Sequence, residues 1–170
     1  LKEKMMTATV TALRAAINNR RIINGSEDIV QLHPVKHVFA LEAYRTGNAN
    51  HWLPQKIPMQ KDVEQWRSSL LTEDDRRVVK MSLGFFATGD SIVANNLVLS
   101  IYRHVTSPEC RLYLLRQAYE EAIHTESYQY MIESLGLDAD EIFTMLMGEK
   151  VGQRKDFIKA EARKVQNLDI

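Results

Sequence analysis

A glutamate, a histidine and a tyrosine share one face of a stretch with strong helical character. Glu121, His124 and Tyr128 are spaced three and four residues apart. Because each residue of an α-helix turns about 100°, their side chains point in similar directions. An unpaired buried carboxylate is costly, and this face is otherwise apolar, with Leu114, Ala118, Ile132 and Leu135. A metal ion accounts for the glutamate and the histidine together, because Glu-x-x-His places two ligands one helical turn apart.

A second carboxylate lies on an apolar helix face earlier in the chain. Asp90 has Phe86, Val93 and Leu97 at the same-face positions i−4, i+3 and i+7. Taken alone, this pattern also fits a solvent-facing aspartate, a buried ion pair or a local kink at Gly89. Glu-x-x-His alone is equally open, since it fits a core histidine beside an ion pair. Together, on neighbouring helices, the two patterns favour one shared metal site.

The elements that would position these residues are all helices, because glycine and proline are few and no strand pattern competes. Thr72 and Ser107 are expected N-caps, the latter followed by a proline at the first helical position, and Gly136 is an expected helix stop. The architecture should be all-α, a single domain over residues 1–170 built around two long antiparallel helices. Helices are predicted at residues 2–18, 36–47, 63–68, 72–104, 107–135, 138–147 and 150–164.

Composition excludes several classes of partner. Lysine plus arginine and aspartate plus glutamate balance at 22 each, which gives no general attraction to nucleic acid or to an anionic membrane. We find no apolar run of about 18 residues and no signal-peptide core, so no membrane span is expected. Cys110 is the only cysteine. It can form no intrachain disulfide, which fits a reducing cytoplasm, and its ordinary role is that of a small apolar residue near a helix start.

The ligand set is incomplete for a dinuclear site. Two divalent ions in a helical bundle usually take about four carboxylates and two histidines, with two Glu-x-x-His motifs. Asp90, Glu121 and His124 supply half of that. No histidine follows His124, and the earlier ones lack a glutamate three residues before them: His33, His37, His51 and His104. The missing ligands must therefore come from another polypeptide or from residues beyond Ile170.

At these residues the chain resembles the radical-generating small subunit of class I ribonucleotide reductase, over nearly its whole length. The resemblance lies in the segments Asn50–Pro54 and Thr88–Ser91, and in Glu121–His124 followed by Tyr128. It implies a ferritin-like helical bundle with a dinuclear iron or manganese site, of which this chain holds only the first half of the ligand helices. In that reading Asp90, Glu121 and His124 are metal ligands.

The same resemblance implies roles for two aromatic residues. Tyr128 would carry a stable tyrosyl radical after two reduced metal ions react with oxygen or a related oxidant. Trp52 would lie on the electron-transfer route to a cysteine of the large subunit, where ribonucleotides are reduced to deoxyribonucleotides. The residues alone favour another role for Trp52, a partly buried anchor for its loop.

The family's second carboxylate and second Glu-x-x-His are absent from this chain. We therefore expect a truncated chain, or a protein made in two pieces. The expected partners are the polypeptide with the second half of the small subunit, a second small subunit in a homodimer, and the large subunit. The expected location is the cytoplasm. Two alternatives stay open: another ferritin-like di-metal oxidase or iron-storage protein, and a non-enzymatic helical interaction domain whose buried charges are merely paired.

Overall fold

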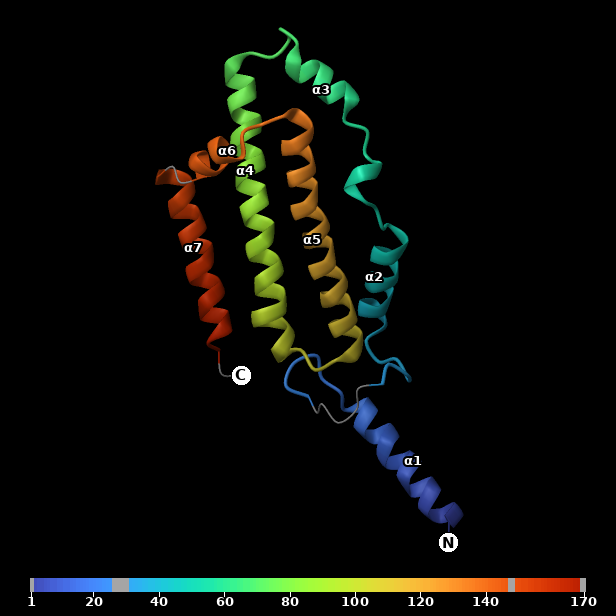
Figure 1. Cartoon of the computed structure of the whole chain (residues 1–170). Helices are drawn as coiled ribbons and strands as arrows, with labels where there is room; N and C mark the ends of the chain where they lie inside the picture. The colour runs from blue at the N-terminus through green and yellow to red at the C-terminus, as the bar shows by residue number, and fades with distance from the viewer. Residues whose placement is uncertain (1, 26–30, 147–148, 169–170) are drawn as a thin grey trace.

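The computed structural model describes residues 2–25, 31–146 and 149–168, and these are mainly helical (Figure 1). Within them, extended pairing is limited to one isolated bridge between Ile23 and Val105. The all-α prediction is therefore confirmed. The helices are α1 (Lys2–Asn18), α2 (Val38–Ala49), α3 (Gln60–Arg67), α4 (Glu73–Asn96), α5 (Pro108–Leu135), α6 (Ala139–Leu146) and α7 (Glu149–Gln166).

The two longest helices, α4 and α5, lie side by side and run in opposite directions at the centre of the molecule (Figure 1). Helix α2 packs on α5, while α6 and α7 pack on α4. Helix α1 projects away from this body (Figure 1). None of the helices in the described parts of the chain is long and apolar enough to cross a membrane.

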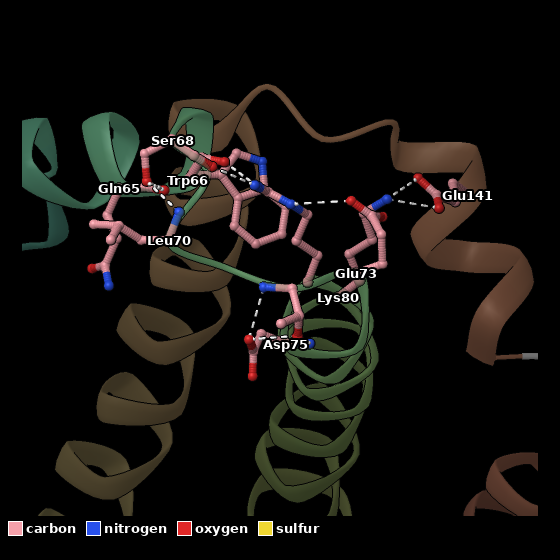
Figure 2. Close-up of polar contacts among 10 residues, drawn as sticks. Gln65, Trp66, Ser68, Leu70, Glu73, Asp75, Lys80 and Glu141 are labelled. Atoms are coloured by element: carbon pink, nitrogen blue, oxygen red, sulfur yellow. Dashed lines mark hydrogen bonds and ion pairs between the residues drawn. The ribbon is translucent and has the colours of Figure 1, made fainter.

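Local signals explain where α4 begins and how its first turns are held. Thr72 and Asp75 form a reciprocal capping box, which satisfies free N–H groups of the first turn. Arg76 donates to backbone carbonyls at the end of α3. Lys80 pairs with Glu141 of α6 at 2.8 Å (Figure 2). These contacts fix α4 relative to both short helices.

Helix α5 begins and ends where its sequence signals predict. The Ser107 hydroxyl accepts a hydrogen bond from the backbone N–H of Cys110 at 3.3 Å, and Pro108 occupies the first turn. Gly136 ends the helix with φ +65°, a left-handed conformation that glycine adopts without steric cost. Cys110 is buried near this helix start, as expected.

Some boundaries differ from the prediction. The helix expected over residues 72–104 is α-helical only to Asn96, after which a π-helical turn (Leu97–Ile101) and a 3₁₀ turn (Tyr102–His104) complete it. Gly89 introduces no break, because the α-helix continues through it. Helix α2 starts two residues later than expected, and α3 starts three residues earlier. The last residue of the helix expected over 138–147 lies outside the described residues.

Two apolar clusters of buried residues pack against α5. One consists of Ala40, Val105 and Cys110, and the other of Leu83, Ile132 and Ile142. The second cluster joins α4, α5 and α6 close to the residues with candidate chemistry. The core thus holds α4 against α5 at the level where their polar side chains meet.

Candidate metal centre

Three potential ligands from α4 and α5 converge between the two helices. His124 Nδ1 lies 3.5 Å from Asp90 Oδ2 and 3.4 Å from Glu121 Oε2. One donor atom from each residue lies within 4.8 Å of the others. The side chains of Asp90, Glu121 and His124 are 20%, 15% and 37% exposed. They are therefore half-buried, and the apolar surroundings expected for Asp90 are only partly present.

The donor set fits a metal such as iron or manganese. Two carboxylates and an imidazole are oxygen and nitrogen ligands of the kind that these divalent ions accept. Among the residues that the structure describes, this is the one group of three or more such side chains close enough to hold an ion. Three candidate ligands would leave positions open for further ones, which matches the incomplete set expected from the sequence.

Tyr128 lies one turn beyond His124 on the same helix. Its ring stacks on Phe86 with centroids 5.8 Å apart, and it packs against the cluster that contains Ile132. Burial raises the pKa of the Tyr128 hydroxyl, and the charge of Asp90, a hydrogen bond with Asp90 and the charge of Glu121 raise it further. The phenol therefore keeps its proton at neutral pH.

Trp52 approaches the same site from the loop after α2. Its ring centroid lies 6.0 Å from that of His124, with the planes tilted by 37°. Its indole Nε1 donates to Glu120 Oε1 at 2.8 Å. The preceding residue, His51, stacks on Tyr119 at 5.9 Å. The structure therefore brings Trp52 against the imidazole of the candidate ligand.

Two polar residues beside the site were not singled out from the sequence. Glu120 receives the indole hydrogen bond of Trp52 and forms an ion pair with Arg116. Arg116 is only 8% exposed and donates to the backbone carbonyl of Gly47 at 2.8 Å. Their spacing of four residues signals a helical ion pair. It does not signal the contact with Trp52, which lies 68 residues away in the chain.

An all-helical bundle whose two central helices bring two carboxylates and a histidine together is the architecture of ferritin-like metal proteins. The family model described as "Ribonucleotide reductase, small chain" matches residues 29–168. The chain therefore belongs to the ribonucleotide reductase small-chain family.

Named relatives agree with this assignment. The chain is 50% identical over 131 residues to the ribonucleoside-diphosphate reductase subunit beta of Chlamydia pneumoniae, covering 76% of this chain and 38% of the relative. The ribonucleotide reductase R2 subunit from Clostridium botulinum superposes with a TM-score of 0.77 at 27% identity, over 85% of this chain and 46% of that one.

A dimanganese(II)-NrdF from Streptococcus sanguinis shares the fold, with a TM-score of 0.72 at 17% identity over 80% of this chain and 48% of that one. The ferritin-like fold is thereby confirmed. The chain spans less than half the length of each of these three proteins.

Proposed function

We propose that this chain supplies three ligands, Asp90, Glu121 and His124, to a dinuclear iron or manganese centre in the small subunit of a ribonucleoside-diphosphate reductase. The observation that carries the proposal is the convergence of these side chains from α4 and α5, in a chain of that family. When bound, the metal ions supply, with oxygen, the oxidising power needed to take one electron from a phenol. The remaining ligands would come from outside this chain.

The residues around the site have distinct tasks in this proposal. Asp90 and Glu121 provide negative charge against the ions, and His124 provides a neutral nitrogen ligand. Tyr128 is the radical residue, and the nearby carboxylates of Asp90 and Glu121 raise the pKa of its hydroxyl. The stacked ring of Phe86 covers one side of the phenol. This limits the access of water to the radical.

Trp52 is proposed as the next residue on the electron-transfer route out of the site, because its ring contacts that of His124. The oxidising equivalent would pass from Tyr128 past His124 to Trp52, and from there to the large subunit, where ribonucleotides become deoxyribonucleotides. The further proposed partners are a second small subunit and the polypeptide that completes the bundle, in the cytoplasm. Oxygen and nitrogen donors suit both iron and manganese, so either metal is compatible with the ligand set.

Metal loading of the complete small subunit tests the proposal. We expect about two ions per site in the wild-type assembly under anaerobic iron loading, and a loss of loading in Glu121→Ala. The matched control is Glu133→Ala, which changes an exposed glutamate of the same helix that pairs only with Gln129 among the contacts of the structure. Wild-type metal content in Glu121→Ala would show that the site lies elsewhere.

A further inference from the structure

We infer that Tyr119 is a second redox-active tyrosine, through which electrons from outside the protein reach Trp52. The inference rests on the proposed function, because Trp52 receives an oxidising equivalent only if the metal centre forms one. Tyr119 is not a candidate ligand, and it lies on a separate branch from the proposed route to the large subunit. Its donor would be an outer-sphere one-electron reductant, which gives up an electron without forming a bond to the protein.

Tyr119 connects the surroundings of the site with solvent. It is 49% exposed on α5, whereas Trp52 and His124 are half-buried. Its ring stacks on that of His51, with centroids 5.9 Å apart and planes inclined by 28°. His51 is itself exposed. The pair therefore presents two aromatic rings to a donor in solution, and the donor need not enter the protein to reach them.

The loop after α2 makes the first of two connections between Tyr119 and Trp52. His51 immediately precedes Trp52 in the chain, so their Cα atoms lie about 3.8 Å apart. His51 stacks on Tyr119, while the Trp52 ring meets that of His124 with centroids 6.0 Å apart. Two consecutive residues of the loop thus place their rings against the same helix. Tyr119 is linked to Trp52 through a single intervening residue, His51.

The second connection runs through polar side chains of α5. The guanidinium of Arg116 lies 5.4 Å from the centroid of the Tyr119 ring. Arg116 forms an ion pair with Glu120, and Glu120 Oε1 accepts a hydrogen bond from the Trp52 indole at 2.8 Å. Each step is a direct contact, and Arg116 is only 8% exposed. Packed atoms therefore join the two rings, and electrons tunnel more readily through such contacts than through open solvent.

The direction of transfer follows from where the phenol proton can go. At neutral pH, a phenol that can release its proton to water is oxidised more easily than an indole. An oxidised Trp52 that keeps its N–H proton takes one electron from Tyr119, and the half-exposed Tyr119 releases its hydroxyl proton to water. The external donor then gives one electron to the Tyr119 phenoxyl, which takes a proton back from water. Both residues end unchanged, and the donor has lost one electron.

Tyr113 provides a matched control. It is 38% exposed and belongs to the same helix. It precedes Tyr119 by six residues, which places it about 120° away around the helix axis. Among the described residues, the ring of Tyr113 forms no aromatic pair with a histidine or a tryptophan. Tyr113→Phe therefore removes a similarly exposed phenol and leaves the contact between His51 and Tyr119 intact.

The first experiment needs no metal ion. In the complete, metal-free small subunit carrying Tyr128→Phe, azide radicals made by pulse radiolysis oxidise tryptophan before tyrosine. Transfer from Trp52 to Tyr119 should appear as a first-order loss of indole radical absorbance, with an equal gain of phenoxyl absorbance. Tyr119→Phe and Trp52→Phe should each remove this phase, whereas Tyr113→Phe should retain it. Tyr119→Phe removes only a hydroxyl, so its ring can still stack on His51.

The second experiment uses the metal-loaded small subunit and follows the Tyr128 radical by electron paramagnetic resonance. Ferrocyanide is the donor, because a multiply charged complex does not enter an apolar interior. Tyr119→Phe should slow the loss of the radical signal severalfold, whereas Tyr113→Phe should lose the signal at the wild-type rate. Metal content should be equal in all three proteins, because the variants leave the candidate ligands unchanged.

Three results would overturn the inference. One is the absence of a Trp52-dependent phase in the Tyr128→Phe protein, and another is a phase that persists after Tyr119→Phe. The third is an equal rate of radical loss with ferrocyanide in Tyr119→Phe and wild type. Failure of the proposed function is recognised differently, by the absence of a tyrosyl radical in the metal-loaded wild-type protein. In that case pulse radiolysis alone decides whether Tyr119 gives electrons to Trp52.

Discussion

At the scale of single residues, the environment of Tyr128 combines a stacked apolar ring with nearby negative charge. Phe86 stacks on the phenol ring, and the charges of Asp90 and Glu121 act on its hydroxyl. Burial and the neighbouring carboxylates raise the pKa of the hydroxyl, so the proton stays on the phenol until an electron is removed. A phenol in this setting is suited to lose an electron and a proton together, with a carboxylate within reach of the proton.

We predict that Tyr128→Phe retains the metal ions and abolishes the tyrosyl radical. The substitution removes only the hydroxyl, so the ring can still stack on Phe86 and the three ligands are unchanged. Metal analysis and electron paramagnetic resonance of the oxygen-treated complete small subunit measure the two quantities. Tyr130→Phe is the control, because the Tyr130 hydroxyl donates to the carbonyl of Ile57 at 3.0 Å, away from the ligands. A tyrosyl signal that persisted in Tyr128→Phe but disappeared in Tyr130→Phe would reassign the radical.

The sequence predicted which residues share a helix face, but not which partners they meet. Helical spacing was sufficient to group Glu121 with His124 and to suggest Asp90 as their companion. The contact between Trp52 and Glu120 joins residues 68 positions apart, and nothing in local spacing indicates it. Such contacts depend on how α2 and its loop pack on α5, which is a tertiary property.

At the scale of elements, a buried glutamate at the start of α5 holds the residues that lead into α2. Glu109 is fully buried, and its Oε1 accepts from the backbone N–H groups of Lys36 at 2.7 Å and His37 at 3.3 Å. Its Oε2 accepts from the hydroxyl of Ser107 at 2.8 Å, and Arg20 lies 3.6 Å from Oε1. The carboxylate thus holds the two residues that immediately precede α2, which starts at Val38.

We predict that protonation of Glu109 lowers the free energy of unfolding of the protein at acidic pH. Burial by itself raises the pKa of this carboxyl, but hydrogen bonds from the backbone N–H groups of Lys36, Glu109 and His37 and from the hydroxyl of Ser107 outweigh it and lower the pKa from 4.5 to about 2. A lowered pKa in the folded state stabilises the protein above the unfolded pKa. The contribution, about 3 kcal/mol, is therefore full above pH 4.5 and is lost as the pH falls towards 2.

Urea unfolding of wild type and Glu109→Gln at several pH values measures this contribution. At neutral pH the variant should be less stable by about 2–4 kcal/mol, because an amide cannot replace a carboxylate that accepts several hydrogen bonds. The difference in the free energy of unfolding between the two proteins should shrink below pH 4.5. In that range the wild-type carboxyl is increasingly protonated in the unfolded protein but not yet in the folded one. If the difference in the free energy of unfolding stayed constant from neutral pH to pH 3, the loss of stability in acid would not come from Glu109.

Helix boundaries were predictable where a chemical signal marks them. Thr72, Ser107 and Gly136 form the expected caps, because capping depends on residues within one turn of the helix end. The π-helical turn at Leu97–Ile101 has no such signal, since it contains neither glycine nor proline. Its residues Leu97 and Ser100 are buried, so the irregular turn accompanies packing against other elements and could not be read from the sequence alone.

At the scale of the whole molecule, the described residues of α4 and α7 leave apolar side chains exposed. Phe86 is 46% exposed, Val93 is 38% exposed and Phe157 is 66% exposed. The chain covers 38% of the length of its Chlamydia pneumoniae relative. We propose that the polypeptide completing the bundle covers this apolar surface, at the same place where it would add the missing ligands.

We predict that stable loading of two metal ions requires this completed assembly. Among its described residues, the chain brings two carboxylates and one imidazole together, whereas a dinuclear site of this kind takes about four carboxylates and two histidines. Anaerobic iron loading followed by desalting should leave about two ions per site in the complete small subunit and far less metal on this chain alone. Glu121→Ala in the complete assembly serves as the control for adventitious iron. If this chain alone retained two ions as firmly as the assembly does, the ligand set would be complete within it, and the proposed need for a second polypeptide would be wrong.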